Sequence, residues 1–204
     1  MVGEFAGARE QARRNREILE ELGLTVMAAT SSSVSAPIEL LAGKPREAER
    51  QLRAGLNELR ELGATLDAGG LAAYLADALY EQGRVREAWA ALETATSGVA
   101  HDVVYAVHIR TVRSKLLVHD RRWSSAISTA KEAVAIADTT DSPNLRGEAR
   151  FYLGFALGGA GENQRARRAF AAALKLLAEK GNLVSAARAE SSLNALRGTS
   201  GANA

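Results

Sequence analysis

The sequence contains no cysteine, only three prolines, and few aromatic residues, which make up 5% of its 204 residues. Without cysteine, neither a disulfide nor a thiolate zinc site can form. No apolar run reaches the roughly 18–20 residues needed to cross a bilayer, and no signal peptide is recognisable at the N-terminus. The net charge is only +2. These absences predict a cytoplasmic chain that does not bind membranes.

Motifs for catalysis and cofactor binding are also scarce. No phosphate-binding loop of the G-x-x-x-x-G-K-[ST] type occurs. The glycine-rich stretch 158–161 is better explained as a turn between helices than as a nucleotide site. The histidines at 101, 108 and 119 show neither i,i+4 pairing nor a cysteine partner. We therefore expect no enzyme activity, no cofactor and no metal.

Charged residues cluster near the N-terminus. Arg9, Arg13, Arg14 and Arg16 form a basic run that could contact phosphate. Acidic residues at 17, 20 and 21 follow it, and no aromatic residue occurs between residues 9 and 21 for base stacking. This pattern favours a solvated helix face with ion pairs, so we expect no nucleic-acid partner.

A periodic register runs through the chain. Alanines recur at intervals of 40, 40, 38 and 40 residues, at Ala8, Ala48, Ala88, Ala126 and Ala166. A turn residue precedes four of them by five positions: Gly43, Gly83, Arg121 and Gly161. Small residues stand seven positions before each turn, and further packing positions follow each alanine at +4 and +7. Spacings of 3, 4 and 7 mark one helical face, so each unit is predicted to be helix, tight turn, helix.

This register resembles the tetratricopeptide repeat (TPR). The best copy, within 147–180, has Leu153-Gly154, Leu157, Gly161, Ala166, Phe170 and Ala173. Further copies are expected at about 29–62, 69–102 and 107–140, although Glu39 stands where an apolar residue is expected. The resemblance implies an all-α, right-handed α-solenoid of antiparallel helix pairs in a single domain, residues 1–197. Because the period exceeds the roughly 34 residues of a TPR unit, we expect longer helices.

The ends of the chain are expected to be incomplete units. Residues 8–23 read as a second helix without its first, and 183–197 as a first helix without its second. Such half-repeats leave apolar faces unpaired, which leaves open a homo-oligomer formed through them. The tail, 198–204, has no apolar pattern and is predicted to be disordered.

Pro37 falls inside the first helix predicted for 25–42. We expect that helix to be kinked at Pro37 or to begin there, because proline is tolerated without penalty only in the first turn. The serine-rich segment 31–35 could be a linker or a phosphorylation patch, but the register favours helix.

The recurring alanines are predicted to be buried where two helices touch. Enlarging Ala88 or Ala166 should therefore overpack a tight helix pair.

A second resemblance concerns short sequence segments rather than the periodic register. Phrases such as Ile-Leu-Glu-Glu-Leu-Gly (18–23) and Ala-Asp-Ala-Leu-Tyr-Glu-Gln-Gly-Arg (76–84) resemble the C-terminal TPR region of large bacterial regulators that carry a cyclase domain and an AAA-type ATPase. Related arrays follow the ATPase in transcription regulators. The resemblance implies a regulatory arm that binds a protein or peptide partner. The alternative is a small-molecule effector sensor that binds its ligand within the superhelix.

The TPR resemblance also implies a binding face. First helices of TPR arrays line the concave groove, with exposed positions 2, 5, 6, 9, 12 and 13 residues into the unit. Transferred to this sequence, the candidate binding residues are Tyr74, Asp77, Tyr80, Glu81, His108, Lys115, His119, Tyr152 and Phe155. Phe151 is also selected, but Phe151 and Phe155 could equally pack against neighbouring repeats, whereas the tyrosine hydroxyls favour groove exposure.

Overall fold

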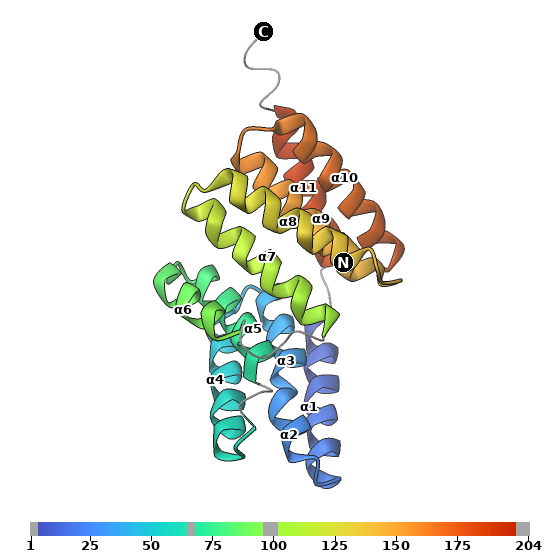
Figure 1. The fold of residues 1–204 in the computed structure, drawn as a ribbon. Helices are drawn as coiled ribbons and strands as arrows, with labels where there is room; N and C mark the ends of the chain where they lie inside the picture. The colour runs from blue at the N-terminus through green and yellow to red at the C-terminus, as the bar shows by residue number, and fades with distance from the viewer. Residues whose placement is uncertain (1–3, 65–67, 96–101, 199–204) are drawn as a thin grey trace. The chain divides into compact units, whose positions relative to one another are not determined.

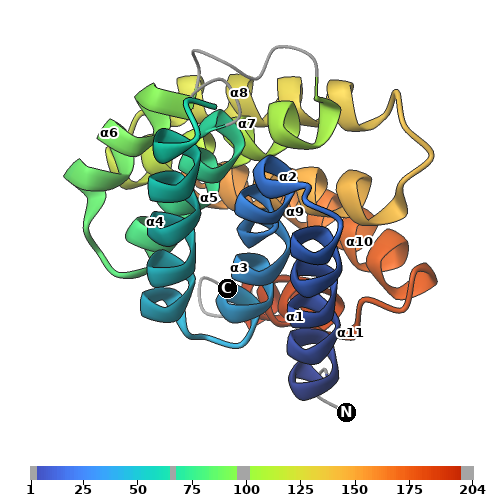
Figure 2. The same cartoon turned by 90° about the horizontal axis from the view of Figure 1, so that it is seen from below.

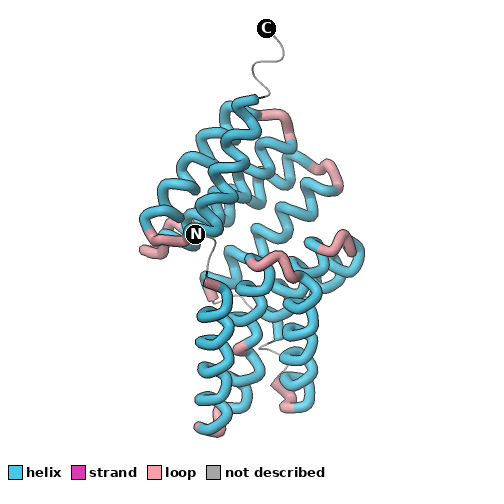
Figure 3. Tube along the Cα trace, turned by 180° about the vertical axis from the view of Figure 1, so that it is seen from behind, coloured by secondary structure: helices cyan, strands magenta, loops and turns pink. Residues whose placement is uncertain are grey.

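The computed structural model describes residues 4–64, 68–95 and 102–198. Within these ranges it contains helices and short loops and no strand (Figures 1 and 3). The helices are α1 (Phe5–Glu21), α2 (Thr25–Thr30), α3 (Ser32–Leu41), α4 (Pro45–Glu61), α5 (Ala68–Glu81), α6 (Val85–Ala95), α7 (Val103–His119), α8 (Trp123–Ala137), α9 (Pro143–Gly159), α10 (Asn163–Glu179) and α11 (Leu183–Gly198). None of these helices is long and apolar enough to cross a membrane. The predicted disordered tail lies outside the described residues, apart from Gly198, the last residue of α11.

The helices form two compact units, which we call the N-terminal unit (residues 4–105) and the C-terminal unit (from residue 106). In the N-terminal unit α1 packs against α2 and α3, α3 against α4, α4 against α5, and α5 against α6 (Figure 2). In the C-terminal unit α8 packs against α9, α9 against α10, and α10 against α11. This serial order confirms the predicted all-α helical-repeat fold. A single continuous domain and its handedness stay predictions.

The predicted turns are confirmed, since a loop separates the helices at Gly43, Gly83, Arg121 and Gly161. All four residues have positive φ, and Arg121, at 56°, is the only non-glycine residue with this conformation in the described ranges. Glycines with φ near 70–78° also end helices between the predicted units, at residues 23, 63 and 181. A residue in the left-handed backbone conformation lets the chain reverse direction after a helix, and glycine adopts this conformation at little energetic cost.

These additional glycines explain the long period. Gly23, Gly43, Gly63 and Gly83 are evenly spaced at 20 residues, so one repeat is two helix-turn segments of equal length. Five of the helices, α1, α4, α7, α9 and α10, have 17 residues each. The excess over a TPR unit therefore lies in longer helices, as the sequence predicted.

The alanine register is the core of both units. Ala48, Ala88, Ala126 and Ala166 are all 0% exposed, which confirms the prediction that Ala88 and Ala166 are buried. Small residues opposite them allow close approach: a Cβ added to Gly154 would lie 2.8 Å from two ring carbons of Phe170. The first alanine, Ala8, is only half-buried because it lies on α1, the second helix of a half-repeat.

The helix predicted for 25–42 is interrupted at Ser31, and not at Pro37. Three consecutive hydroxyls, those of Thr30, Ser31 and Ser32, donate to carbonyl oxygens three residues earlier, with Ser31 Oγ 2.6 Å from Ala28 O. Such bonds compete with the backbone ladder and bend helices. Pro37 lies inside α3, so the helix does not begin at this proline, and a kink at Pro37 stays a prediction.

Candidate functional site

The predicted residues of α5 lie in the N-terminal unit and differ in exposure. Glu81 is exposed, Tyr74 and Tyr80 are half-buried, and Asp77 is buried at 8% exposure. The Tyr74 ring meets the edge of Tyr105 at a centroid distance of 6.3 Å. Tyr74 and Tyr105 therefore form an aromatic pair, which covers part of the Tyr74 ring.

The predicted residues of α7 and α9 meet in the C-terminal unit. Lys115 Nζ lies 5.5 Å from the centroid of the Tyr152 ring, within reach of a cation–π interaction. Arg188 of α11 approaches the same ring, with Cζ 5.5 Å from its centroid and Nη1 3.4 Å from the hydroxyl oxygen. Lys115, Tyr152 and Arg188 therefore form a row to which α7, α9 and α11, the first helices of successive repeats, contribute one residue each. Sequence reasoning missed Arg188 because α11 was treated as an incomplete unit.

Two of the candidate residues are buried, against the expectation that groove positions are exposed. Lys115 is 2% exposed and Asp77 is 8% exposed. The groove positions transferred from TPR arrays are an average over repeats, and they take no account of neighbouring side chains that cover the middle of a helix. The Tyr152 ring is part of what covers Lys115. His108 and Phe155 are half-buried, and His119 is exposed.

The phenylalanines of α9 pack inward. Phe151 is 6% exposed and belongs to the C-terminal core, with its ring centroid 5.3 Å from that of Phe170. Phe155 is half-buried against the same core. The packing alternative, which the sequence left open for these two residues, therefore applies.

An apolar stripe on α2 and α3 was not predicted. Met27, Val34 and Leu41 are 54%, 52% and 39% exposed. They are seven residues apart, so they lie on one side of the nearly continuous helix pair. Val34 and Leu41 are positions 6 and 13 of the unit that begins at residue 29. Applying the groove spacing to residues 29–62, as was done for the later units, would have identified both.

A cavity of about 780 Å³, lined mostly by charged and polar residues, lies between α1, α3 and α4. On its wall Glu39, 3% exposed, accepts two bonds from Arg9, at 2.6 Å and 2.8 Å. The carboxylate thus replaces the apolar residue that the repeat expects, and the guanidinium of α1 compensates its charge. The side-chain amide of Gln51 donates a hydrogen bond from Nε2 to Glu47 Oε1, at 3.1 Å. The other polar atom of this amide, Oε1, is buried and accepts no hydrogen bond from the described residues.

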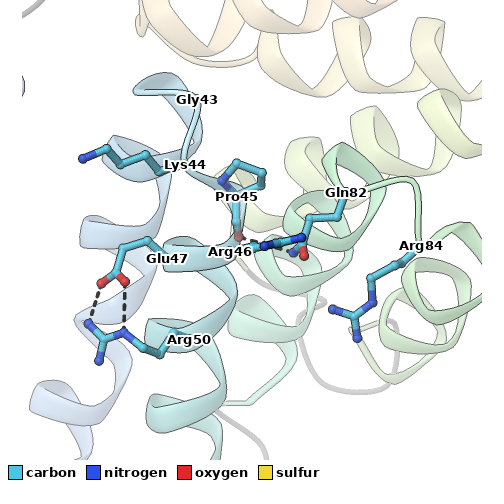
Figure 4. Close-up of a pocket in the computed structure, with 8 residues that line it drawn as sticks. All are labelled: Gly43, Lys44, Pro45, Arg46, Glu47, Arg50, Gln82 and Arg84. Carbon is cyan, nitrogen blue, oxygen red and sulfur yellow. Dashed lines mark hydrogen bonds and ion pairs between the residues drawn. The ribbon is translucent and has the colours of Figure 1, made fainter.

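A second hollow, which we call the turn pocket, has a volume of about 750 Å³. It lies where the α3–α4 turn meets the α5–α6 turn, and Figure 4 shows the side chains around it. The lining residues are Gly43, Lys44, Pro45, Arg46, Glu47, Arg50, Gln82 and Arg84. Four cations thus face one carboxylate.

Ion pairs fix the carboxylates around the turn pocket. A hydrogen bond from Arg50 holds the pKa of Glu47 below its ordinary value. Burial alone would raise the pKa of Glu49, but hydrogen bonds from Gln82, Arg53 and Arg84 lower it. These carboxylates are therefore ionised at neutral pH. Throughout the described ranges, no group of three or more His, Asp or Glu side chains is arranged to hold a metal ion.

Comparison with known proteins supports the fold alone. No protein-family profile matches the chain, and no curated protein matches it. Its structure is similar to BtubC (BKLC) from P. vanneervenii, with a TM-score of 0.59 and 16% identity over 99% of this chain and 94% of that one. It is also similar to the apo form of RapI, with a TM-score of 0.58 and 14% identity over 93% of this chain and 54% of RapI. The chain therefore has a helical-repeat fold.

Proposed function

We propose that this chain is a non-catalytic module that binds a protein or peptide, with the apolar stripe as part of its binding face. The observation that carries the proposal is the exposure of Met27, Val34 and Leu41 in one row. Water contact with large apolar side chains is unfavourable by roughly 25 cal/mol per Å², so a row of exposed apolar side chains favours a partner that covers it. The aromatic and charged residues predicted from the later repeats stay candidates for further contacts.

The cellular role follows from the sequence resemblance. The sequence segments that resemble bacterial cyclase and ATPase regulators support a role as the C-terminal regulatory arm of such a protein. A regulatory arm of a transcription regulator is the related alternative, and either would act in the cytoplasm. The helical-repeat fold is compatible with this role because stacked repeats present extended binding surfaces.

A small-molecule sensor is the second candidate function. The cavity between α1, α3 and α4 favours it, because its size suits a small ligand and most of its lining residues, Gln51 among them, are charged or polar.

Substitutions on the stripe test the main proposal. A partner is first recovered from native lysate and its binding measured by calorimetry. Val34→Lys with Leu41→Lys should weaken binding at least roughly tenfold, or about 1.4 kcal/mol. The matched control is Leu183→Lys, an exposed leucine of the C-terminal unit. Equal affinity of the folded stripe variant and the control would contradict a binding role for the stripe.

The second candidate has its own readout. A metabolite that raises the thermal midpoint, and loses this effect in Gln51→Leu, would favour the sensor. The stripe variant should not change that shift, because Val34 and Leu41 do not line the cavity.

A further inference from the structure

Two cations of the turn pocket, Lys44 and Arg46, form no ion pair within the described ranges, although the charge of Lys44 helps to lower the pKa of Glu47. Arg84 is held by two carboxylates: Nη1 lies 2.7 Å from Glu49 Oε2, and Nε lies 2.8 Å from Glu87 Oε1. Arg50 is paired with Glu47. Lys44 and Arg46 are exposed, and neither forms an ion pair with a described residue. Counted with Glu47, Glu49 and Glu87, the four cations of the pocket keep a net positive charge of one.

This charge lies next to the apolar stripe. Leu41 is the last residue of both α3 and the stripe, and Lys44 follows three residues later. Three Cα–Cα steps of about 3.8 Å place Lys44 within about 11 Å of Leu41. A single extended or helical segment can cover both features, with apolar residues on the stripe and anionic residues at the turn.

The surroundings favour separate carboxylates over a polyphosphate. Glu47 lines the pocket, and Glu49 and Glu87 lie beside Arg84, so a continuous phosphate backbone would meet like charges. The lining also lacks an aromatic ring on which a base could stack. A peptide can place acidic side chains at Lys44 and Arg46 and uncharged ones beside the glutamates.

We propose that the turn pocket binds the acidic end of an amphipathic peptide whose apolar residues cover Met27, Val34 and Leu41. This inference rests on the proposed function and specifies its partner. Exposed cations are solvated, so their contribution is to orient the segment and speed its association, and it weakens as salt is added.

The test uses a labelled peptide with a leucine-rich half and an aspartate-rich half, and fluorescence anisotropy as the readout. Its isosteric control has asparagine in place of every aspartate. The protein variant is Lys44→Glu with Arg46→Glu. The matched variant is Lys131→Glu with Arg168→Glu, two exposed cations of α8 and α10 that change the net charge equally. Melting followed by circular dichroism checks that both variants are folded.

We expect the aspartate peptide to bind the wild type and the Lys131/Arg168 variant alike, and the Lys44/Arg46 variant at least roughly tenfold more weakly. The asparagine peptide should bind all three weakly. Absence of binding, equal losses in the two charge variants, or full competition by inorganic phosphate alone would overturn the proposal. If Val34→Lys weakens binding but the Lys44/Arg46 variant does not, the proposed function stands and the acidic-partner inference fails.

Discussion

Two glycines of α9 provide a sharp test of the packing register. A methyl group added at Gly154 would lie 2.8 Å from Cδ1 and Cε1 of Phe170 and 3.0 Å from Cγ. Phe170 is 4% exposed and lies in the C-terminal core, so its ring has little room to move. At Gly158, one turn later, the nearest atom is Ala166 Cβ at 3.9 Å, an ordinary contact.

The expected effects of alanine therefore have opposite signs. Overpacking costs about 1–3 kcal/mol, and replacing a helical glycine by alanine gains about 0.5–1 kcal/mol. Gly154→Ala should lower the free energy of unfolding by about 0.5–2 kcal/mol, because the clash outweighs the gain. Gly158→Ala should raise it by about 0.5–1 kcal/mol, because the gain is unopposed.

Urea unfolding measures both variants against the same background. The chain has two tryptophans, Trp89 in α6 and Trp123 in α8, so a Trp89→Phe background makes fluorescence report on the C-terminal unit. The midpoints should shift in opposite directions with an unchanged slope. If both alanines stabilise the unit, Phe170 does not pack on Gly154 as the structure describes.

Three further predictions also use urea unfolding, followed by circular dichroism so that both units are observed. Ala88→Leu and Ala166→Leu should each cost about 1–3 kcal/mol by overpacking; unchanged urea midpoints in both would contradict the register. Arg121→Gly should stabilise the α7–α8 turn by up to about 1–2 kcal/mol, because glycine adopts the positive φ of 56° without strain; a lower midpoint would contradict this. A hydrogen bond from Arg150 lowers the pKa of Asp138, so the pair stabilises the fold above the ordinary carboxyl pKa and this contribution is lost as pH falls through the lowered value. Asp138→Asn should therefore reduce the loss of stability between about pH 7 and about pH 3 by up to about 1 kcal/mol; an identical pH dependence would refute the role of the pair.

The parts of the fold that could be predicted are those that local chemistry dictates. A residue with positive φ is required at each turn, and a small residue is required where two helices touch, so Gly83, Gly161, Ala88 and Ala166 could be located from spacing alone. The same signal continued in the inter-unit glycines such as Gly63, which sequence reasoning did not use.

The parts that could not be predicted depend on side chains that meet through the fold. Arg9 and Glu39 are 30 residues apart, and nothing in the period indicates that α1 would supply the partner of a buried carboxylate. The interruption at Ser31 comes from hydroxyls that bond to their own helix, which an apolar pattern does not register. Arg188 approaches Tyr152 only because α11 packs as a further first helix.

Methionine methyl NMR tests the central claim, that a partner covers the stripe, most directly. The chain has two methionines, Met1 and Met27, so selective ¹³C labelling of the methyl groups gives one reporter on the stripe. Addition of the recovered partner, or of the leucine–aspartate peptide, should shift or broaden the Met27 signal, and Val34→Lys with Leu41→Lys should abolish the change. A partner that binds by calorimetry and leaves the Met27 signal unchanged would show that the binding face lies elsewhere.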